Sequence, residues 1–296
     1  MKTYKQSLGA NIFDVFNLIL LLAIAFICLY PMIYVIMASL SSPSLLMQHS
    51  GLLLKPLGLH FDAYKSVLAN PDITTGYANT LFYVVIGTIL SDALTMMAAY
   101  VVSRKKFPLR NFFNIILILT MFINGGLIPS YLNIQNLGLL NTRLSQILPV
   151  AVSAYNVIIL RTYMTSIPVS LEESARMDGA SHLRVLFCII FPLCLPVFAV
   201  ITLYYAVGTW NSWFNAMIYL TDRSKYPLQL FLREILILNE TDSLINSNAA
   251  SGIEQVQISE TIKYATIVIS TVPILCIYPF LQKYFVKGVM IGAVKE

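Results

Sequence analysis

The residues that can carry enzyme chemistry are few in this 296-residue chain, and they do not form a recognisable group. The three histidines, His49, His60 and His182, lie far apart and form no H-E-x-x-H pair. No glycine is followed by lysine, which excludes a phosphate-binding P-loop, and no G-x-S-x-G segment occurs. The four cysteines have no C-x-x-C spacing. We therefore expect a non-catalytic protein with no metal site and no cofactor of its own.

A short polar segment at residues 167–181 carries the boundary signals of a helix. Ser170 and Glu173 have the spacing of a capping box, which predicts a helix start at Ser170. Gly179 suits the left-handed residue that ends a helix, and Ser181 can cap the helix that follows. The pattern predicts a short helix at about 170–180, and propensity alone favours a simple connector that lies on a membrane surface.

The composition places the rest of the chain in lipid. Hydrophobic residues make up 57%, charged residues 11%, and the mean hydropathy is +0.74. A soluble globular chain has about 25% charged residues, which cover its surface. Crossing about 30 Å of hydrocarbon takes about 20 apolar residues, so a retained span must be a long apolar stretch. Six such stretches predict six membrane-spanning helices, at about 13–40, 78–102, 111–128, 145–162, 185–207 and 264–285.

The basic residues predict the direction of these spans. With the N-terminus inside, the inner segments hold 12 of the 19 Lys and Arg residues, and the loop 103–110 holds the densest group. Both termini are therefore expected to be cytoplasmic. The net charge of +5 is then explained by the basic residues at the inner ends of the spans, and it does not indicate an anionic partner. Two long outer loops are expected, at 41–77 and 208–263, within a single transmembrane domain that covers residues 1–296.

A polar and aromatic group follows the fifth predicted span. Aromatic faces stack on sugar rings, and amides and hydroxyls bind sugar hydroxyls, so the group is a candidate substrate path or receptor contact. An aromatic belt at the membrane interface explains the same pattern. The group consists of Tyr204, Tyr205, Trp210, Asn211, Trp213, Phe214 and Asn215.

Two further polar residues lie inside predicted spans. Asp92 is an acid within the second span, where it must be paired or face water, and we expect a hydrogen-bonded place in the bundle interior. Asn124, followed by Gly125 and Gly126, predicts a break or bend in the third span.

The polar segment at 167–181 also carries a resemblance to a known family. Glu173-Ser174-Ala175, three residues, Gly179, nine residues and Ile189-Ile190-Phe191-Pro192 resemble the EAA loop of binding-protein-dependent ABC importer permeases. That pattern is E-A-A, three residues, G, nine residues, I-x-L-P; Ser174 and Phe191 depart from it. Asp178-Gly179-Ala180 matches the D-G-A usual in sugar permeases. Residues 122–129, 136–142, 210–213 and 287–295 resemble the oligosaccharide permeases typified by LplB and YtcP.

The resemblance implies a fold and a set of partners. The fold would be an all-α, polytopic, MalG-like type I ABC importer transmembrane domain in the cytoplasmic (inner) membrane of a prokaryote. The partners would be a second homologous permease, two cytoplasmic ATPases that bind the ATP and Mg, an extracytoplasmic solute-binding protein and an oligosaccharide. The segment at 170–180 would be the coupling helix that docks on the ATPase, and the residues implied for that contact are Glu172, Glu173, Ala175, Asp178 and Gly179. The outer loop near 221–262 would be a candidate contact for the binding protein, or a variable exposed loop.

Two rival functions remain open at this point. The first is an ABC permease for another solute, such as an amino acid, phosphate or polyamine. The second is a gradient-driven transporter or channel, which would need no ATPase. Nothing in the residues suggests a nucleic-acid partner, since the basic residues lie in short groups between apolar runs.

Overall fold

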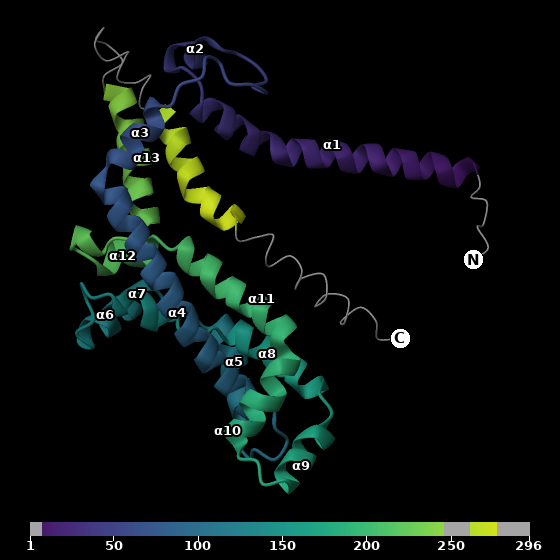
Figure 1. Ribbon diagram of the computed structural model, residues 1–296. Coiled ribbons are helices and arrows are strands. Elements are labelled where there is room, and N and C mark those ends of the chain that lie inside the picture. The colour runs from purple at the N-terminus through teal and green to yellow at the C-terminus, as the bar shows by residue number, and fades with distance from the viewer. Residues whose placement is uncertain (1–7, 246–260, 277–296) are drawn as a thin grey trace. The chain divides into compact units, whose positions relative to one another are not determined.

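The computed structural model describes residues 8–245 and 261–276, and these are helices joined by short connections, with no strand among them (Figure 1). The helical fold class is therefore confirmed. The chain divides into two compact units, one formed by Met1–Asn70 with Ile235–Thr271 and the other by Pro71–Glu234 with Val272–Glu296. The single-domain organisation stays a prediction.

The first unit is built around a long apolar helix, α1 (Leu8–Ser39). Pro31 lies inside it, and a 28-residue part, Ile12–Ser39, is apolar enough to span a membrane. Its C-terminal end packs through Ala38 against Leu46 and Leu53. The segment 41–77, expected as an outer loop, contains α2 (Pro43–Gln48), α3 (Asp62–Ala69) and the start of α4, and its place outside the membrane stays a prediction.

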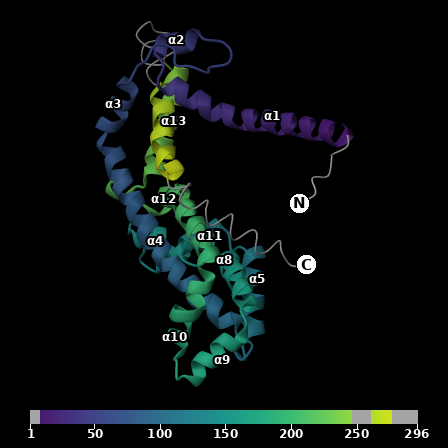
Figure 2. The same cartoon turned by 45° about the vertical axis from the view of Figure 1, so that its right-hand side comes forward.

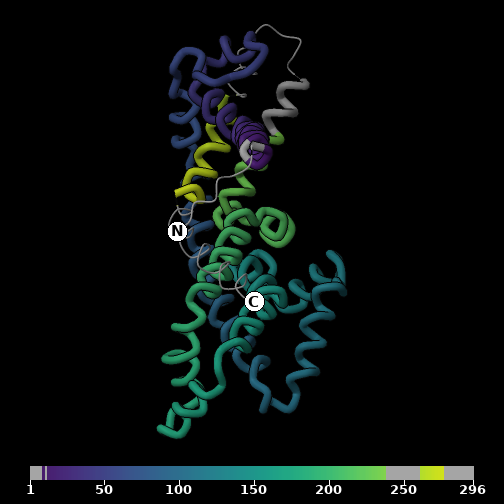
Figure 3. Tube along the Cα trace, turned by 90° about the vertical axis from the view of Figure 1, so that its right-hand side faces the viewer, coloured from purple at the N-terminus to yellow at the C-terminus, as the bar shows by residue number. Residues whose placement is uncertain are grey.

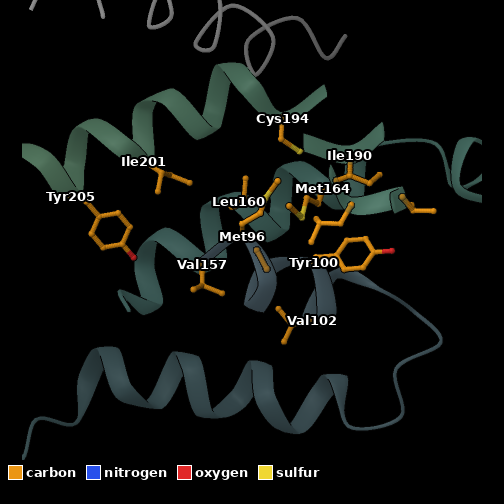
Figure 4. Packing of buried hydrophobic residues seen from close by; sticks show 13 residues of the cluster. Met96, Tyr100, Val102, Val157, Leu160, Met164, Ile190, Cys194, Ile201 and Tyr205 are labelled. Carbon is orange, nitrogen blue, oxygen red and sulfur yellow. The ribbon is translucent and has the colours of Figure 1, made fainter. Parts of the chain in front are cut away.

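The second unit is organised by three helices, α4 (Pro71–Ser103), α8 (Ala154–Ser166) and α11 (Phe191–Trp210). They pack against one another, and α4 lies beside α11 in both ribbon views (Figures 1 and 2). Figure 4 shows their shared core of apolar side chains, with Cys194 and Ile201 on α11 facing the other two helices. The core is lined by Met96, Tyr100, Val102, Val157, Leu160, Met164, Ile190, Cys194, Ile201 and Tyr205.

The predicted third span, 111–128, is wrong as a continuous helix. Helix α5 (Arg110–Phe122) ends inside this range. Helix α6 (Leu127–Asn136) follows after four residues, and the chain bends by 117° between the two helices (Figure 3). The side chain of Asn124 accepts a hydrogen bond from the Gly126 amide at 2.9 Å, and Gly126 has φ +87°, a backbone that favours glycine. The predicted break at Asn124 is thus confirmed.

The fourth and fifth predicted spans are helices with internal irregularities. In the fourth, α7 (Leu144–Ile147) and a 3₁₀ turn, η1 (Leu148–Val150), meet α8 at a 48° bend. In the fifth, α10 (His182–Val185), a π-helical turn, η2 (Leu186–Ile190), and α11 form one apolar stretch, His182–Trp210. Pro192 and Pro196 lie in α11, and a proline cannot donate the usual backbone hydrogen bond.

The expected outer loop at 208–263 is also mostly helical where it is described. It contains the end of α11, α12 (Phe214–Tyr219), a 3₁₀ turn, η3 (Arg223–Lys225), α13 (Leu228–Ile245) and the first residues of a helix over Thr261–Cys276. The last predicted span, 264–285, lies only partly within the described residues.

The described residues show part of the predicted set of membrane spans. Three helices are long and apolar enough to cross a membrane, and five spans result if each bent pair counts as one. The six predicted spans are not confirmed. The 117° bend at residues 123–126 and the 48° bend at residues 151–153 divide two apolar stretches into helices shorter than a span, which hydropathy alone does not reveal.

Candidate functional site

Helix α9 (Val169–Met177) occupies the segment predicted at 170–180. Its N-cap is Pro168, with extended backbone at ψ 127°, and no side chain caps the N-terminus. The predicted capping box is therefore wrong. Because Val169 already takes the first helical position, Ser170 lies inside the first turn, where it cannot act as the N-cap.

The C-terminus of α9 follows the prediction closely. Gly179 has φ +80°, the left-handed conformation expected at this position. Its amide donates to the carbonyl of Arg176, and the amide of Ala180 donates to the carbonyl of Ala175, each at 3.0 Å. These two bonds form a Schellman motif. The side chain of Ser181 then accepts from the Arg184 amide and caps α10, as predicted.

Glu172 fastens α9 to the end of α4. Its side chain is only 7% exposed, and it accepts hydrogen bonds from Tyr100 Oη at 3.2 Å and Arg176 Nη2 at 2.6 Å. Arg104 Nη1 pairs with its other carboxylate oxygen. The family resemblance implied Glu172 for the contact with the ATPase, but its carboxylate is buried and binds residues of its own chain. We call Glu172, Tyr100, Arg104 and Arg176 the latch.

The latch joins two elements that are distant in sequence. Tyr100 lies in the last turn of α4 and Arg104 directly follows the helix, and the Arg104 guanidinium lies 4.5 Å from the centre of the Tyr100 ring. A buried carboxylate is stable only when its charge is paired and hydrogen-bonded. The two arginines and the tyrosine meet that need, so α9 and α4 are held as one piece.

The other residues implied for the coupling contact lie on different faces of α9. Ala175 is half-buried and packs against the core of the three helices. Glu173, Asp178 and Gly179 are exposed, and Met177 is 88% exposed. The helix thus has an inner face bound to its own chain and an outer, charged face open to a partner.

A cavity lies at the other end of the same three helices. Its volume is about 490 Å³, within the range of small-molecule sites. Its lining is aromatic and neutral polar, and no described residue in it carries a charge. The lining consists of Gln146, Val150, Ser153, Tyr155, Asn156, Tyr204, Tyr205, Gly208, Thr209 and Ser212.

Two of the predicted aromatic residues border this cavity in different ways. Tyr205 is buried, and its hydroxyl shares a 2.7 Å hydrogen bond with Thr95 Oγ1 and accepts from the Ser153 amide at 2.9 Å. It therefore ties α11 to α4 and to the start of α8. Tyr204 is exposed, and its ring lies 6.4 Å from that of Tyr155. Tyr204 is thus the one of the two that a ligand can contact broadly.

The remaining residues of the predicted polar and aromatic group do not join the cavity. Trp210 is buried, with its ring 6.2 Å from Tyr77. Trp213 lies under the guanidinium of Arg233, 3.6 Å from the ring centre. The other three lie at or beyond the end of α11: Asn211 is its C-cap, and Phe214 and Asn215 begin α12.

Asp92 lies in the bundle interior, as predicted. It is 8% exposed and its Oδ2 accepts a 2.7 Å hydrogen bond from Thr202 Oγ1 on α11. Neither the cavity nor the latch includes it. Its place favours a structural link between α4 and α11.

The turn after α12 is fixed to α4 near the cavity end. Asn79 donates to the carbonyls of Ser224 at 2.7 Å and Tyr226 at 3.0 Å, and Tyr83 Oη donates to that of Lys225 at 2.7 Å. Hydrogen bonds from the Ser224 hydroxyl, from Lys225 and from the Ser224 amide lower the pKa of Asp222 to about 2. This turn lies in the segment 221–262, whose contact with the binding protein stays a prediction.

Sequence reasoning missed most of the cavity lining and most of the latch. Three of the cavity residues, Gln146, Ser153 and Asn156, are polar side chains within a predicted apolar span. Polar residues in such a span usually have a functional or structural role, and this could have identified them as candidates. Tyr100 and Arg104 share one helix face by their spacing, but nothing in the sequence says that this face meets Glu172.

Comparison with known proteins identifies the family. Residues 91–291 match the model of the binding-protein-dependent transport system inner membrane component. The chain is 38% identical over 293 residues to protein LplC of Bacillus subtilis (strain 168), covering 99% of this chain and 98% of that one. It is 39% identical over 285 residues to the polygalacturonan/rhamnogalacturonan transport system permease protein YtcP of the same organism, covering 96% and 99%. The chain belongs to this family of binding-protein-dependent ABC permeases, as the EAA-like loop had indicated.

A solved structure shares the fold. It is the crystal structure of a bacterial ABC transporter involved in the import of the acidic polysaccharide alginate, with 36% identity and a TM-score of 0.85. The match covers 96% of this chain and 100% of that chain. The resemblance to YtcP drawn from motifs is confirmed, and the Lpl-type relative found here is LplC, where the motifs had suggested LplB.

Proposed function

We propose that this chain is a permease subunit of an ATP-driven importer that carries oligosaccharides across the cytoplasmic membrane by alternating access. The proposal is supported chiefly by the two faces of α9. Its outer face is charged and exposed, and its inner face is fixed to α4 by the latch. The names of its relatives support a carbohydrate substrate, since they include a polygalacturonan/rhamnogalacturonan permease and an ABC transporter involved in the import of alginate.

The proposed role of α9 is to transmit movement of an ATPase to the three-helix bundle. Glu173 and Asp178 supply charges for a groove on the partner, and helix-in-groove docking is a common binding mode. Glu172 acts as a positioning residue, since a displacement of α9 pulls on Arg104 and so on α4. ATP-driven closure would then bias the equilibrium between inward-open and outward-open states.

The proposed sugar path includes the cavity beside Tyr204. Uncharged amide and hydroxyl groups, here Gln146, Asn156 and Thr209, are suited to sugar hydroxyls. The exposed ring of Tyr204 gives a surface for the C–H face of a sugar. Since the described lining holds no charge, this chain would contact neutral parts of an oligosaccharide.

The partners follow from the family and from the chemistry that this chain lacks. Two cytoplasmic ATPases would bind ATP and Mg, a second permease would complete the path, and an extracytoplasmic solute-binding protein would deliver the sugar. The turn at Arg223–Lys225 is the proposed receptor contact. Both termini and α9 would then lie on the cytoplasmic side.

The test is transport by the whole complex in liposomes. Oligosaccharide uptake and ATP hydrolysis are measured together, with the solute-binding protein present, for the wild type and for Gly179→Pro. Proline cannot adopt φ +80°, so the variant should lose most uptake while the ATPases still hydrolyse ATP. Full uptake by the variant would contradict the coupling role.

The same preparation separates the rival functions. A gradient-driven transporter would take up solute without ATPase subunits, and these would not co-purify with it. A permease for a non-sugar solute would show ATPase stimulation by an amino acid, phosphate or polyamine, and none from an oligosaccharide panel.

A further inference from the structure

A second cavity, of about 380 Å³, lies beside the latch and is strongly basic. It is formed by the C-terminal ends of α4 and α8, the loop between α4 and α5, and α9. Basic side chains line it from three consecutive positions, Arg104, Lys105 and Lys106, and also from Arg110 and Arg176. Its acidic residues are Glu172 and Glu173.

The positive charge of this cavity exceeds what the chain itself neutralises. Five basic residues face two acidic ones, and the Glu172 carboxylate is taken up by Arg104 and Arg176. Within the described parts of the chain, no acidic side chain pairs with Lys105, Lys106 or Arg110. The site is therefore electropositive and open to an anion.

Arg104 supplies an independent sign that a ligand is expected. Its Nη1 pairs with Glu172, but its Nε and Nη2 are buried and have no hydrogen-bond partner among the described residues. Buried donors of a charged group without an acceptor are costly, and native proteins rarely leave them so. An anion with several acceptor oxygens, such as a phosphate group, meets this need.

The neighbouring helix indicates where that phosphate comes from. Helix α5 starts at Arg110 on the rim of the cavity, and none of its residues is buried. Phe112, Ile115 and Leu119 expose about half of their surface. A cationic pocket that continues into an exposed apolar helix matches a phospholipid, with its phosphate in the pocket and its acyl chains along the helix.

We propose that the basic cavity binds the phosphate group of an anionic phospholipid from the cytoplasmic leaflet. The proposal rests on the proposed placement of α9 at the cytoplasmic surface. A bound lipid phosphate would satisfy Arg104, neutralise the lysines, and brace the corner between α4 and α5 against α9. A free phosphate ion has the same head chemistry but gains nothing from α5.

The test measures lipid retention by the intact complex. The complex is placed in nanodiscs of phosphatidylcholine with a minor share of phosphatidylglycerol, released in the gas phase, and the retained phosphatidylglycerol is counted by native mass spectrometry. The double variant Lys105→Gln/Lys106→Gln should weaken retention by about tenfold or more, since each such charge near an anionic surface contributes about 1 kcal/mol. Both side chains are exposed, so in nanodiscs of phosphatidylcholine alone the thermal transition of the variant should match that of the wild type.

A matched control removes the same charge elsewhere. Lys55→Gln/Lys65→Gln alters two exposed lysines near α3 and should retain phosphatidylglycerol like the wild type. Equal retention in both double variants would overturn the proposal, as would loss of ATPase assembly in Lys105→Gln/Lys106→Gln with lipid retention unchanged. Displacement of the lipid by millimolar inorganic phosphate would overturn the lipid assignment in favour of a free ion. Sugar uptake is scored separately, so failure of this proposal does not depend on the transport function.

Discussion

The two ends of the three-helix bundle differ in the way they use polarity. At the start of α8, a cavity is lined by neutral hydroxyls, amides and tyrosine rings, while at its end the latch and its surroundings concentrate charge. Helix α8 contributes to both sites, together with α7 and α11 at the neutral cavity and with α4, α5 and α9 at the charged end. Between them lies a core of apolar side chains (Figure 4).

The difference matches what each end is proposed to do. Neutral groups can hold a sugar and release it, since no buried charge must be paired again when it leaves. The charged end must transmit force, and a carboxylate held by two arginines resists displacement because a separated pair leaves buried charge unpaired. We infer that one end of the bundle is built for exchange and the other for rigid connection.

Among the variants considered, those that break the latch should cause the largest loss of stability and of coupling between ATP hydrolysis and uptake. Glu172→Ala leaves Arg104 and Tyr100 without their acceptor and should lower the stability of the complex by about 3 kcal/mol, the lower end for a buried pair because Arg176 is partly exposed. Uptake per ATP hydrolysed should fall with it. Thermal unfolding and coupled transport assays measure the two effects.

The exposed neighbour is the control for the latch. Glu173→Ala should reduce coupling but leave the unfolding transition in place, since Glu173 lies on the outer face of α9. Glu172→Asp should recover part of the lost stability. Equal unfolding temperatures for Glu172→Ala and Glu173→Ala would show that the latch does not hold α9.

At the cavity end, a single hydroxyl should matter next most. Tyr205→Phe removes the hydrogen bonds to Thr95 and to the Ser153 amide, and leaving such buried groups unpaired costs about 1–3 kcal/mol. Tyr204→Phe, the matched change on an exposed tyrosine, should leave stability unchanged and, because it keeps the ring, should change the KM for oligosaccharide uptake little. Tyr204→Ala, which removes the ring, should raise that KM a few-fold. A drop in stability for Tyr204→Phe alone would reverse the roles given to the two residues.

A smaller loss of stability is expected when the left-handed glycine at the end of α9 is replaced. Gly179→Ala places a Cβ in open space but in a left-handed conformation, which costs about 1–2 kcal/mol. Gly138→Ala imposes the same conformation, φ +68°, at the end of α6. Both variants should lose similar stability, whereas only Gly179→Ala should reduce uptake per ATP.

The smallest effect concerns acidity at the proposed receptor contact. The pKa of Asp222 is lowered from 3.8 to about 2, so its stabilisation of the turn is present above pH 3.8 and is lost only as the pH falls through about 2. Hydrogen-exchange protection of the Ser224 amide, corrected for its intrinsic rate, should therefore be the same at pH 7 and pH 5. A marked loss of protection at pH 5 would contradict the hydrogen-bonding scheme of this turn.

Local signals in the sequence predicted local structure well. The glycine stop at Gly179, the cap at Ser181 and the break at Asn124 all depend on neighbouring residues, and all three are confirmed. The capping box at Ser170 was wrong because Pro168 starts the helix earlier. Hydropathy located the apolar helices but joined α5 to α6, since it does not register a left-handed glycine.

Contacts between segments that are distant in the chain could not be predicted from the sequence. Glu172 and Glu173 are adjacent acidic residues, and the local sequence predicts the same exposure for both. In the structure Glu172 is buried against Arg104, 68 residues earlier in the chain, while Glu173 is exposed. The predicted aromatic group divided for the same reason, because α11 turns Tyr205 inward and Tyr204 toward the cavity. Which face of a helix meets its neighbours is decided by packing.

The central claim is that the outer face of α9 meets the ATPase, and photo-crosslinking tests it most directly. A photoreactive amino acid at Met177, which is 88% exposed on α9, is compared with the same residue at Met217, which is 48% exposed on α12. After illumination of the assembled complex, we expect a covalent product with the ATPase subunit from position 177 and none from position 217. Crosslinking to the ATPase from position 217, with none from position 177, would contradict it.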